Sequence, residues 1–81
     1  MTIRIKLFAV LREKAGMSEM RIEVPPQATV AAARDVLVRQ LPALAPLLPR
    51  VAFAVNLSYA AIETVLKDGD ELAILPPVSG G

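Results

Sequence analysis

The sequence contains no cysteine and no histidine among its 81 residues. No disulfide can form, and neither a catalytic cysteine nor a serine–histidine–aspartate triad can be built, because each needs a residue that is absent. A zinc site with cysteine or histidine ligands is excluded for the same reason. Because a chain without disulfides suits a reducing compartment, we expect a cytoplasmic protein.

Aromatic side chains and an excess of one charge are also lacking. The only aromatic residues are Phe8, Phe53 and Tyr59, and nine basic residues against eight acidic ones leave a net charge of +1. Proteins that bind nucleic acid usually combine a basic patch with exposed aromatic side chains on which bases stack. We therefore expect no nucleic-acid partner.

Long apolar runs are interrupted. Three prolines break the uncharged run at residues 41–49, which therefore cannot cross a bilayer, and residues 2–6 alternate instead of forming a secretory signal. We expect no membrane partner. Hydrophobic residues nevertheless make up 54% of the chain, which is what a domain this small needs to fill a core.

The first third of the chain predicts a strand, a short helix and a second strand. Apolar and charged residues alternate over residues 2–8 and 20–24, which is typical of half-buried strands. Residues 9–15 suit a short helix that ends at Gly16. Opposite charges on the outward faces of the two strands predict cross-strand ion pairs.

The main helix is predicted at residues 30–41, with Thr29 as its N-cap and Pro42 after its end. Asp35 and Arg39 are four residues apart, which predicts an ion pair on the exposed face. The apolar face carries Val30, Ala33, Leu37 and Leu41.

Leucine, proline and alanine dominate residues 41–50, for which we predict an ordered loop with a turn or two of helix. Its leucines would fill one end of the core, and a partner groove is the alternative. Further on, Asp68-Gly69 predicts a tight turn with positive φ at the glycine. Strands are predicted at residues 51–55, 59–61 and 71–75, the last with Leu72 and Ile74 on one face.

This order predicts an α+β domain over residues 1–75. An early hairpin followed by a crossover helix indicates a β-grasp arrangement, with a mixed sheet of four to five strands and the main helix on one face. If the first and last strands pair in parallel, the tail at residues 76–81 leaves the sheet from a central strand. Periodicity alone does not show that pairing.

The body of the chain presents no convincing catalytic or metal site. Asp68, Asp70 and Glu71 cluster, but a calcium loop needs a distal acidic ligand, and no acid follows Glu71. Gly80-Gly81 is not a phosphate-binding loop, because no helix or lysine follows it. We expect no metal and no cofactor bound by the chain itself, and no catalysis by the chain alone.

The last six residues, Pro76-Pro77-Val78-Ser79-Gly80-Gly81, remain as the candidate site. Two prolines restrict the backbone to an extended course, and two glycines without Cβ atoms can thread where other side chains would clash. The Gly81 carboxylate would become reactive if a partner activated it as an acyl-adenylate with ATP. A mobile end without function is the alternative.

The chain resembles the small subunit of molybdopterin synthase over nearly its whole length. The resemblance is carried by Leu7-Phe8-Ala9, by residues 66–73 (Leu-Lys-Asp-Gly-Asp-Glu-Leu-Ala) and above all by the Pro-Pro-Val-Ser-Gly-Gly ending. That family often has an aromatic residue before the two prolines, where this chain has Leu75. A Gly-Gly end alone also suits sulfur carriers for thiamin or tRNA thiolation and ubiquitin-like protein modifiers.

The resemblance implies a ubiquitin-like β-grasp fold and a role as sulfur carrier. An E1-like enzyme would adenylate Gly81 with ATP, and a sulfur donor would convert it to a thiocarboxylate. The tail would then enter the large subunit of a heterotetramer and give its sulfur to cyclic pyranopterin monophosphate. Phe8, Leu75 and Val78 are our candidates for apolar docking contacts.

Overall fold

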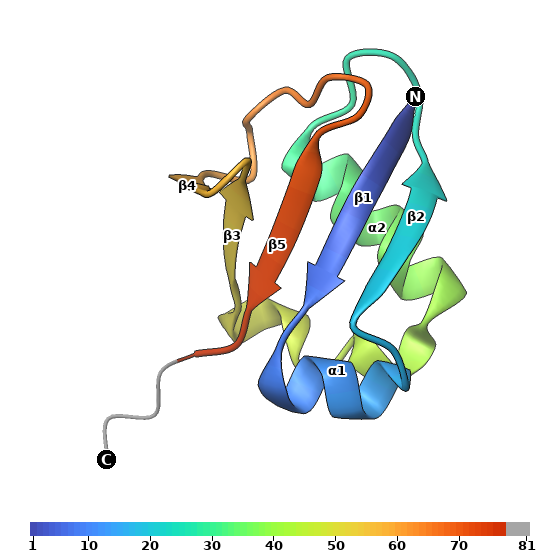
Figure 1. Cartoon of the computed structure of the whole chain (residues 1–81), viewed down its shortest axis with the longest axis vertical. Helices are drawn as coiled ribbons and strands as arrows, with labels where there is room; N and C mark the ends of the chain where they lie inside the picture. The colour runs from blue at the N-terminus through green and yellow to red at the C-terminus, as the bar shows by residue number, and fades with distance from the viewer. Residues whose placement is uncertain (78–81) are drawn as a thin grey trace.

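The computed structural model describes residues 1–77, which form a five-stranded mixed sheet with one long helix against one face (Figure 1). The strands lie in the order β2-β1-β5-β3-β4. Their bounds are β1 Thr2–Leu7, β2 Glu19–Glu23, β3 Ala52–Val55, β4 Ser58–Ala60 and β5 Glu71–Leu75. The helices are α1 Ala9–Ala15 and α2 Val30–Gln40, followed by two short 3₁₀ helices, η1 Pro42–Leu44 and η2 Leu48–Arg50.

The parallel pairing of β1 with β5 organises the sheet. Ile5 faces Leu72 and Leu7 faces Ile74 across this pair, while β1 with β2, β3 with β5 and β3 with β4 are antiparallel. A parallel pair needs a long crossover connection, and here that connection contains α2. The β-grasp prediction is confirmed, together with the central position of the last strand.

The helices begin and end close to where the local signals place them. The Thr29 hydroxyl accepts a hydrogen bond from the Ala32 N–H at 3.2 Å, so Thr29 is the N-cap of α2. Gly16 closes α1 in the left-handed conformation, with φ of 75°. Both predictions are confirmed.

The predicted ion pair between Asp35 and Arg39 is wrong. The Asp35 carboxylate lies instead 3.7 Å from Nε of Arg34, its neighbour in the chain. Asp35 is exposed, so packing does not decide which cation it approaches, and either pair contributes only ~0–1 kcal/mol.

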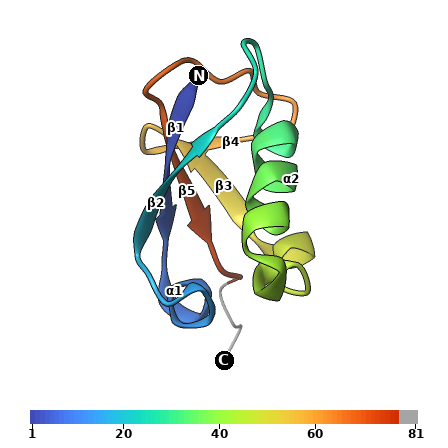
Figure 2. The same ribbon diagram turned by 90° about the vertical axis from the view of Figure 1, so that its right-hand side faces the viewer.

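The core lies between α2 and the inner face of the sheet (Figure 2). Within residues 1–77 no polar or charged residue is buried, so stability rests on apolar burial, at roughly 1.5–3 kcal/mol per large side chain. The largest fully buried side chains are Ile3, Ile5, Leu7, Leu11, Ile22, Val30, Leu37, Leu44, Leu66, Leu72 and Ile74.

The segment at residues 41–50 contains η1 and η2, as predicted, and closes one end of the core. Leu44 and Leu48 are buried, whereas the three prolines of the segment are exposed. η1 packs against both α1 and α2. The prediction that these leucines fill the end of the core is confirmed.

The turn at residues 67–70 ties the start of β1 to the start of β5. The Thr2 N–H donates to Oδ1 of Asp68 at 2.8 Å, and the Lys67 N–H donates to Oδ2 of Asp70 at 2.8 Å. Gly69 has a φ of 84°, as the predicted tight turn requires. The clustered acids thus shape a turn.

None of the helices in the described part of the chain is long and apolar enough to cross a membrane.

Candidate functional site

The tail begins at the end of the middle strand of the sheet. β5 is paired with β1 on one side and with β3 on the other, and its own residues Leu72 and Ile74 are fully buried on the inner face. Its last ladder pair joins Leu75 to Ala52, and Pro76, which has no N–H to donate, follows at once. The middle strand of the sheet, paired on both sides, therefore determines where the tail leaves the body.

Only the first two residues of the predicted tail are described. Pro76 is half-buried and Pro77 is exposed. Val78, Ser79, Gly80 and Gly81 lie outside the described residues, and the roles expected for them stay predictions.

A hollow of about 300 Å³ lies beside the base of the tail. Pro76 and Pro77 form part of its wall, and Val10 of α1 and Leu47 and Arg50 of the 41–50 segment form other parts. The segment thus contributes buried leucines to the core and, on its outer side, a wall next to the tail. This arrangement restricts the directions in which Pro76 and Pro77 can run.

A second hollow, of about 270 Å³, lies on the outer face of the sheet, opposite α2. Two alanines in the middle of the sheet, Ala54 on β3 and Ala73 on β5, face each other across the strand pair and form part of its lining. Larger apolar side chains line it as well: Phe8, Leu57, Tyr59 and Leu75. We call these six residues the apolar patch.

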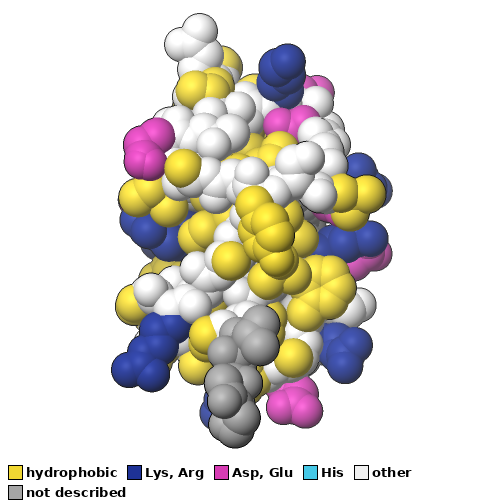
Figure 3. Space-filling view, turned by 90° about the vertical axis from the view of Figure 1, so that its left-hand side faces the viewer, with side chains coloured by type: hydrophobic (Ala, Val, Ile, Leu, Met, Phe, Trp, Pro, Cys, Tyr) yellow, Lys and Arg dark blue, Asp and Glu magenta, His cyan; other side chains and the backbone are white. Residues whose placement is uncertain are grey.

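The four large side chains of the apolar patch are wholly or partly open to solvent, whereas its two alanines are buried. Tyr59 is 82% exposed and Phe8 is 40% exposed, whereas most apolar side chains of the sheet are buried. Figure 3, which looks onto the β4 side of the molecule, shows apolar side chains gathered in the middle and charged side chains toward the margins. Clustered exposed apolar side chains of this kind mark surfaces that bind a partner.

The structure brings two of the three predicted docking residues together, and the third, Val78, lies outside the described residues. Phe8 and Leu75 line the same hollow, although they are far apart in the sequence, and neither is part of the buried core. Leu75 is also the last residue before the tail, so the apolar patch and the tail adjoin. Their role in docking stays a prediction.

Leu57 and Tyr59 were not among the expected site residues. Both belong to the hairpin of β3 and β4, where Val55 faces Ser58 and only Asn56 and Leu57 form the loop. The sequence signal that could have identified them is Leu57 itself, because a two-residue hairpin loop normally has glycine at that position.

Asn56 fastens this hairpin to the turn before β5. Its side-chain amide donates to Oδ1 of Asp70 at 2.9 Å, and its Oδ1 accepts from the Glu71 N–H at 3.0 Å. Asn56 and Leu57 both have positive φ, at 49° and 73°, as in a type I′ turn. The position of the apolar hairpin is therefore set by polar contacts to β5.

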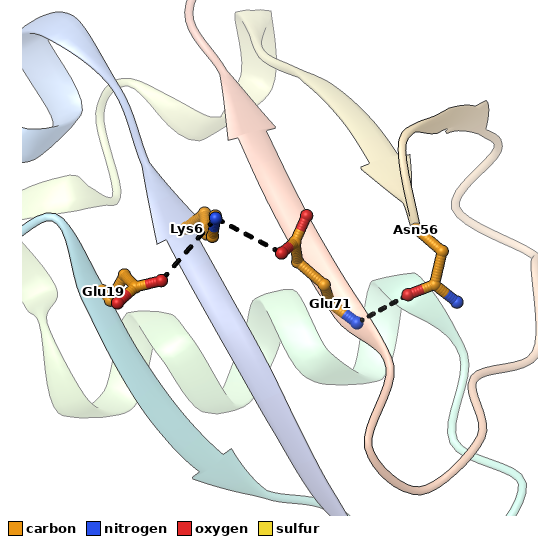
Figure 4. A network of polar contacts seen from close by, with 4 residues as sticks. All are labelled: Lys6, Glu19, Asn56 and Glu71. Carbon is orange, nitrogen blue, oxygen red and sulfur yellow. Dashed lines mark hydrogen bonds and ion pairs between the residues drawn. The ribbon is translucent and has the colours of Figure 1, made fainter.

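An ion-pair network borders the apolar patch. Nζ of Lys6 lies 3.7 Å from Oε1 of Glu19 on β2 and 3.4 Å from Oε1 of Glu71 on β5 (Figure 4). The Lys6–Glu19 pair confirms the prediction of cross-strand ion pairs, although Arg4 faces Arg21 in the same ladder. The network places charge at the edge of the hollow and leaves its centre apolar.

Comparisons with known proteins place this geometry in a family. The model of the ThiS family matches residues 5–81. The chain is 35% identical to a molybdopterin synthase sulfur carrier subunit of Arabidopsis thaliana over 79 residues, which cover 98% of this chain and 82% of that protein.

Solved structures agree. The crystal structure of SAMP1 from Haloferax volcanii covers all of both chains with a TM-score of 0.91 and 38% identity. A protein–protein complex of subunits 1 and 2 of the molybdopterin-converting factor from Helicobacter pylori contains a chain matched over the full length of both, with a TM-score of 0.72 and 26% identity. The ubiquitin-like β-grasp fold is thereby confirmed. With a family match from residue 5 to residue 81 and relatives that align over nearly the whole chain, this protein belongs to the ThiS family and is a homologue of molybdopterin synthase sulfur carrier subunits.

Proposed function

We propose that this chain is the sulfur-carrying small subunit of a molybdopterin synthase. The observation that carries the proposal is the continuity of the apolar patch with the tail: Leu75 lines the patch, and Pro76 begins the tail. A partner that receives the tail must therefore cover the patch as well. The named relatives and the Helicobacter pylori complex of two subunits support this partner.

The chemistry is assigned to Gly81. An E1-like partner joins the Gly81 carboxylate to AMP from ATP, with release of pyrophosphate, and a sulfur donor then displaces AMP to leave a thiocarboxylate. In this proposal the E1-like partner, and not this chain, binds the ATP. Because ATP supplies the activation, we place these steps in the cytoplasm.

The tail delivers that sulfur to the large subunit. Ordering a flexible residue costs roughly 1–2 kcal/mol, and Pro76 and Pro77 reduce this cost because their backbone freedom is already limited. Val78 and Ser79 continue the tail, and Gly80 and Gly81 pass where side chains would clash. At its end the sulfur passes to cyclic pyranopterin monophosphate to build molybdopterin, in a heterotetramer of two small and two large subunits.

The apolar patch holds the large subunit while the tail is inserted. Full burial of a side chain the size of Phe8 or Leu75 contributes roughly 1.5–3 kcal/mol, so a few such contacts can offset much of the cost of ordering the tail. Lys6 and Glu71 border the patch with charge. In this arrangement the patch supplies affinity and the tail supplies the chemistry.

Two linked measurements test the proposal. Incubation with the activating enzyme, ATP and a sulfur source is expected to raise the mass of the intact protein by the difference between sulfur and oxygen, located at Gly81 by fragmentation. Deletion of Gly81 is expected to abolish molybdopterin formation by the reconstituted synthase. If the truncated protein supported normal molybdopterin formation, the proposal would be wrong.

A protein modifier is the second candidate function, favoured by 42% identity to the small archaeal modifier protein 1 (SAMP1) of Haloferax volcanii, whose crystal structure matches with a TM-score of 0.91. It uses the same activated Gly81 but transfers it to lysine amines of other proteins. A blot of cells that express a tagged chain would show a ladder of lysine-linked conjugates. A deletion strain separates the remaining carriers, because loss of molybdopterin, of thiazole or of tRNA thiolation identifies the pathway.

A further inference from the structure

Leu57 occupies a position that the fold itself gives no reason to fill with leucine. Its side chain is 88% exposed, so it contributes almost nothing to the core. Its φ of 73° lies in the left-handed region, where an L-residue with a Cβ atom is disfavoured and glycine is not. Both facts predict that glycine at this position would suit the fold at least as well.

The hairpin imposes this conformation. Val55 faces Ser58, so only two residues close the loop, and the type I′ turn that they form has positive φ at both of them. Asn56 is suited to such a φ and is held by Asp70 and Glu71, but Leu57 has no comparable anchor. A strained apolar residue kept in solvent points to a role outside folding.

The position of Leu57 indicates what that role is. Leu57 lines the same hollow as Leu75, which directly precedes the tail. The partner that receives the tail must therefore lie over this hollow, and it meets Leu57 at the tip of the β3–β4 hairpin. The tight turn fixes the backbone of Leu57 before the partner arrives, so little backbone freedom is lost on binding.

We propose that Leu57 is an apolar anchor that inserts into an apolar recess of the tail-accepting subunit, and that the chain keeps it there at the expense of its own stability. This inference rests on the proposed function, because it assumes that the same partner takes the tail. It goes beyond that function by assigning a binding contact to one side chain at the hairpin tip.

The test separates stability from binding in the full-length chain. Leu57→Gly and Leu57→Asn remove the apolar side chain and place at this position a residue that adopts positive φ more readily than leucine. Calorimetry is expected to show a melting temperature equal to or above that of the wild type. Titration against the purified large subunit of the same organism is expected to show binding weakened by about tenfold or more, since a leucine side chain is no longer buried.

Two variants serve as controls. Val65→Asn removes an apolar side chain that is 55% exposed but does not line the hollow, and its affinity for the large subunit is expected to equal that of the wild type. Leu57→Met keeps a flexible apolar side chain at the hairpin tip and is expected to retain most of the affinity.

The outcomes distinguish the two levels of the proposal. If the wild type binds and Leu57→Gly binds equally well, the anchor role is wrong and the proposed function stands. If Leu57→Gly lowers the melting temperature markedly, Leu57 is a structural residue and the inference is also wrong. If the wild type dimerises and Leu57→Gly abolishes only that dimer, the anchor serves a second copy instead. If the wild type itself does not bind the large subunit, the proposed function fails, and this inference fails with it.

Discussion

The two faces of the central strands differ in what their apolar residues do. On the inner face, Leu72 and Ile74 of β5 are fully buried under α2, as are their neighbours on β1. On the outer face, β1 presents Arg4 and Lys6, but β5 presents Ala73 and Leu75 around an open hollow. One strand therefore carries apolar residues on both faces: the inner ones are fully buried, whereas on the outer face Ala73 is buried and Leu75 stays partly exposed beside the hollow.

This difference separates residues that specify the fold from residues that are available to a partner. Alternation of apolar and polar residues, as in β1, is sufficient for a sheet that is covered on one side. The outward apolar residues of β5 and of the β3–β4 hairpin are not required by that arrangement. Their concentration next to the start of the tail is what connects the fold to its proposed function.

The largest expected effect comes from comparing two leucines of the same strand. Leu72→Ala leaves a cavity on the inner face and is expected to lower the free energy of unfolding by about 2–5 kcal/mol. Leu75→Ala removes a half-buried outward side chain and is expected to cost about 1 kcal/mol. Urea unfolding of the two variants measures both values. Equal losses would mean that the outer face is as much part of the core as the inner one.

The second prediction concerns the aromatic side chains of the apolar patch, which lie outside the buried core. Phe8→Ser combined with Tyr59→Ser is expected to lower the free energy of unfolding by no more than about 2 kcal/mol, since Tyr59 is 82% exposed and Phe8, although only 40% exposed, lies outside the buried core. Binding to the large subunit is expected to weaken by about a hundredfold, as two aromatic contacts are lost. Ile62→Ser is the matched control, because the exposed fraction of Ile62, 42%, is similar to that of Phe8, and Ile62 does not line the hollow.

The inner face could be predicted from the sequence because its signals are local. Alternation located β1 and β5, the Thr29 cap and helical spacing located α2, and the Asp68-Gly69 pair located the turn. The parallel pairing of β1 with β5 joins residues that are more than sixty apart and followed only from the expected fold. The Asp35 ion pair was predicted wrongly because exposed charges are not held by packing.

The outer face was predicted only in part. Phe8 lies one residue beyond β1 and follows the outward parity of Arg4 and Lys6, so alternation alone could have placed it outside. Leu57 and Tyr59 depend on the two-residue loop, because a loop longer by one residue would reverse which side chains of β4 face the hollow. Such a register is determined by the tertiary pairing of β3 with β5 and β4.

A smaller effect is expected from the polar contacts that fasten the β3–β4 hairpin to the start of β5. Asn56→Ala removes the hydrogen bonds to Asp70 and Glu71 and is expected to cost about 1–2 kcal/mol, because each such bond contributes roughly 0.5–1.5 kcal/mol net. Faster hydrogen exchange is expected in residues 52–60 and not in β1 or β2. Uniformly faster exchange would show that the hairpin and the core open together.

The smallest expected effect concerns the charged border. Lys6→Met removes both the Glu19 and the Glu71 ion pairs, which are partly exposed and together contribute about 1 kcal/mol or less. The stability difference from the wild type is expected to shrink in 1 M salt, where charges are screened within about 3 Å. The large subunit should still bind, since the hollow stays apolar and Lys6 lies at its edge. If Lys6→Met weakened binding as much as the Phe8 and Tyr59 substitutions, the charged border and not the apolar patch would hold the partner. The two faces would then differ in charge, and the apolar residues of the outer face would need another explanation.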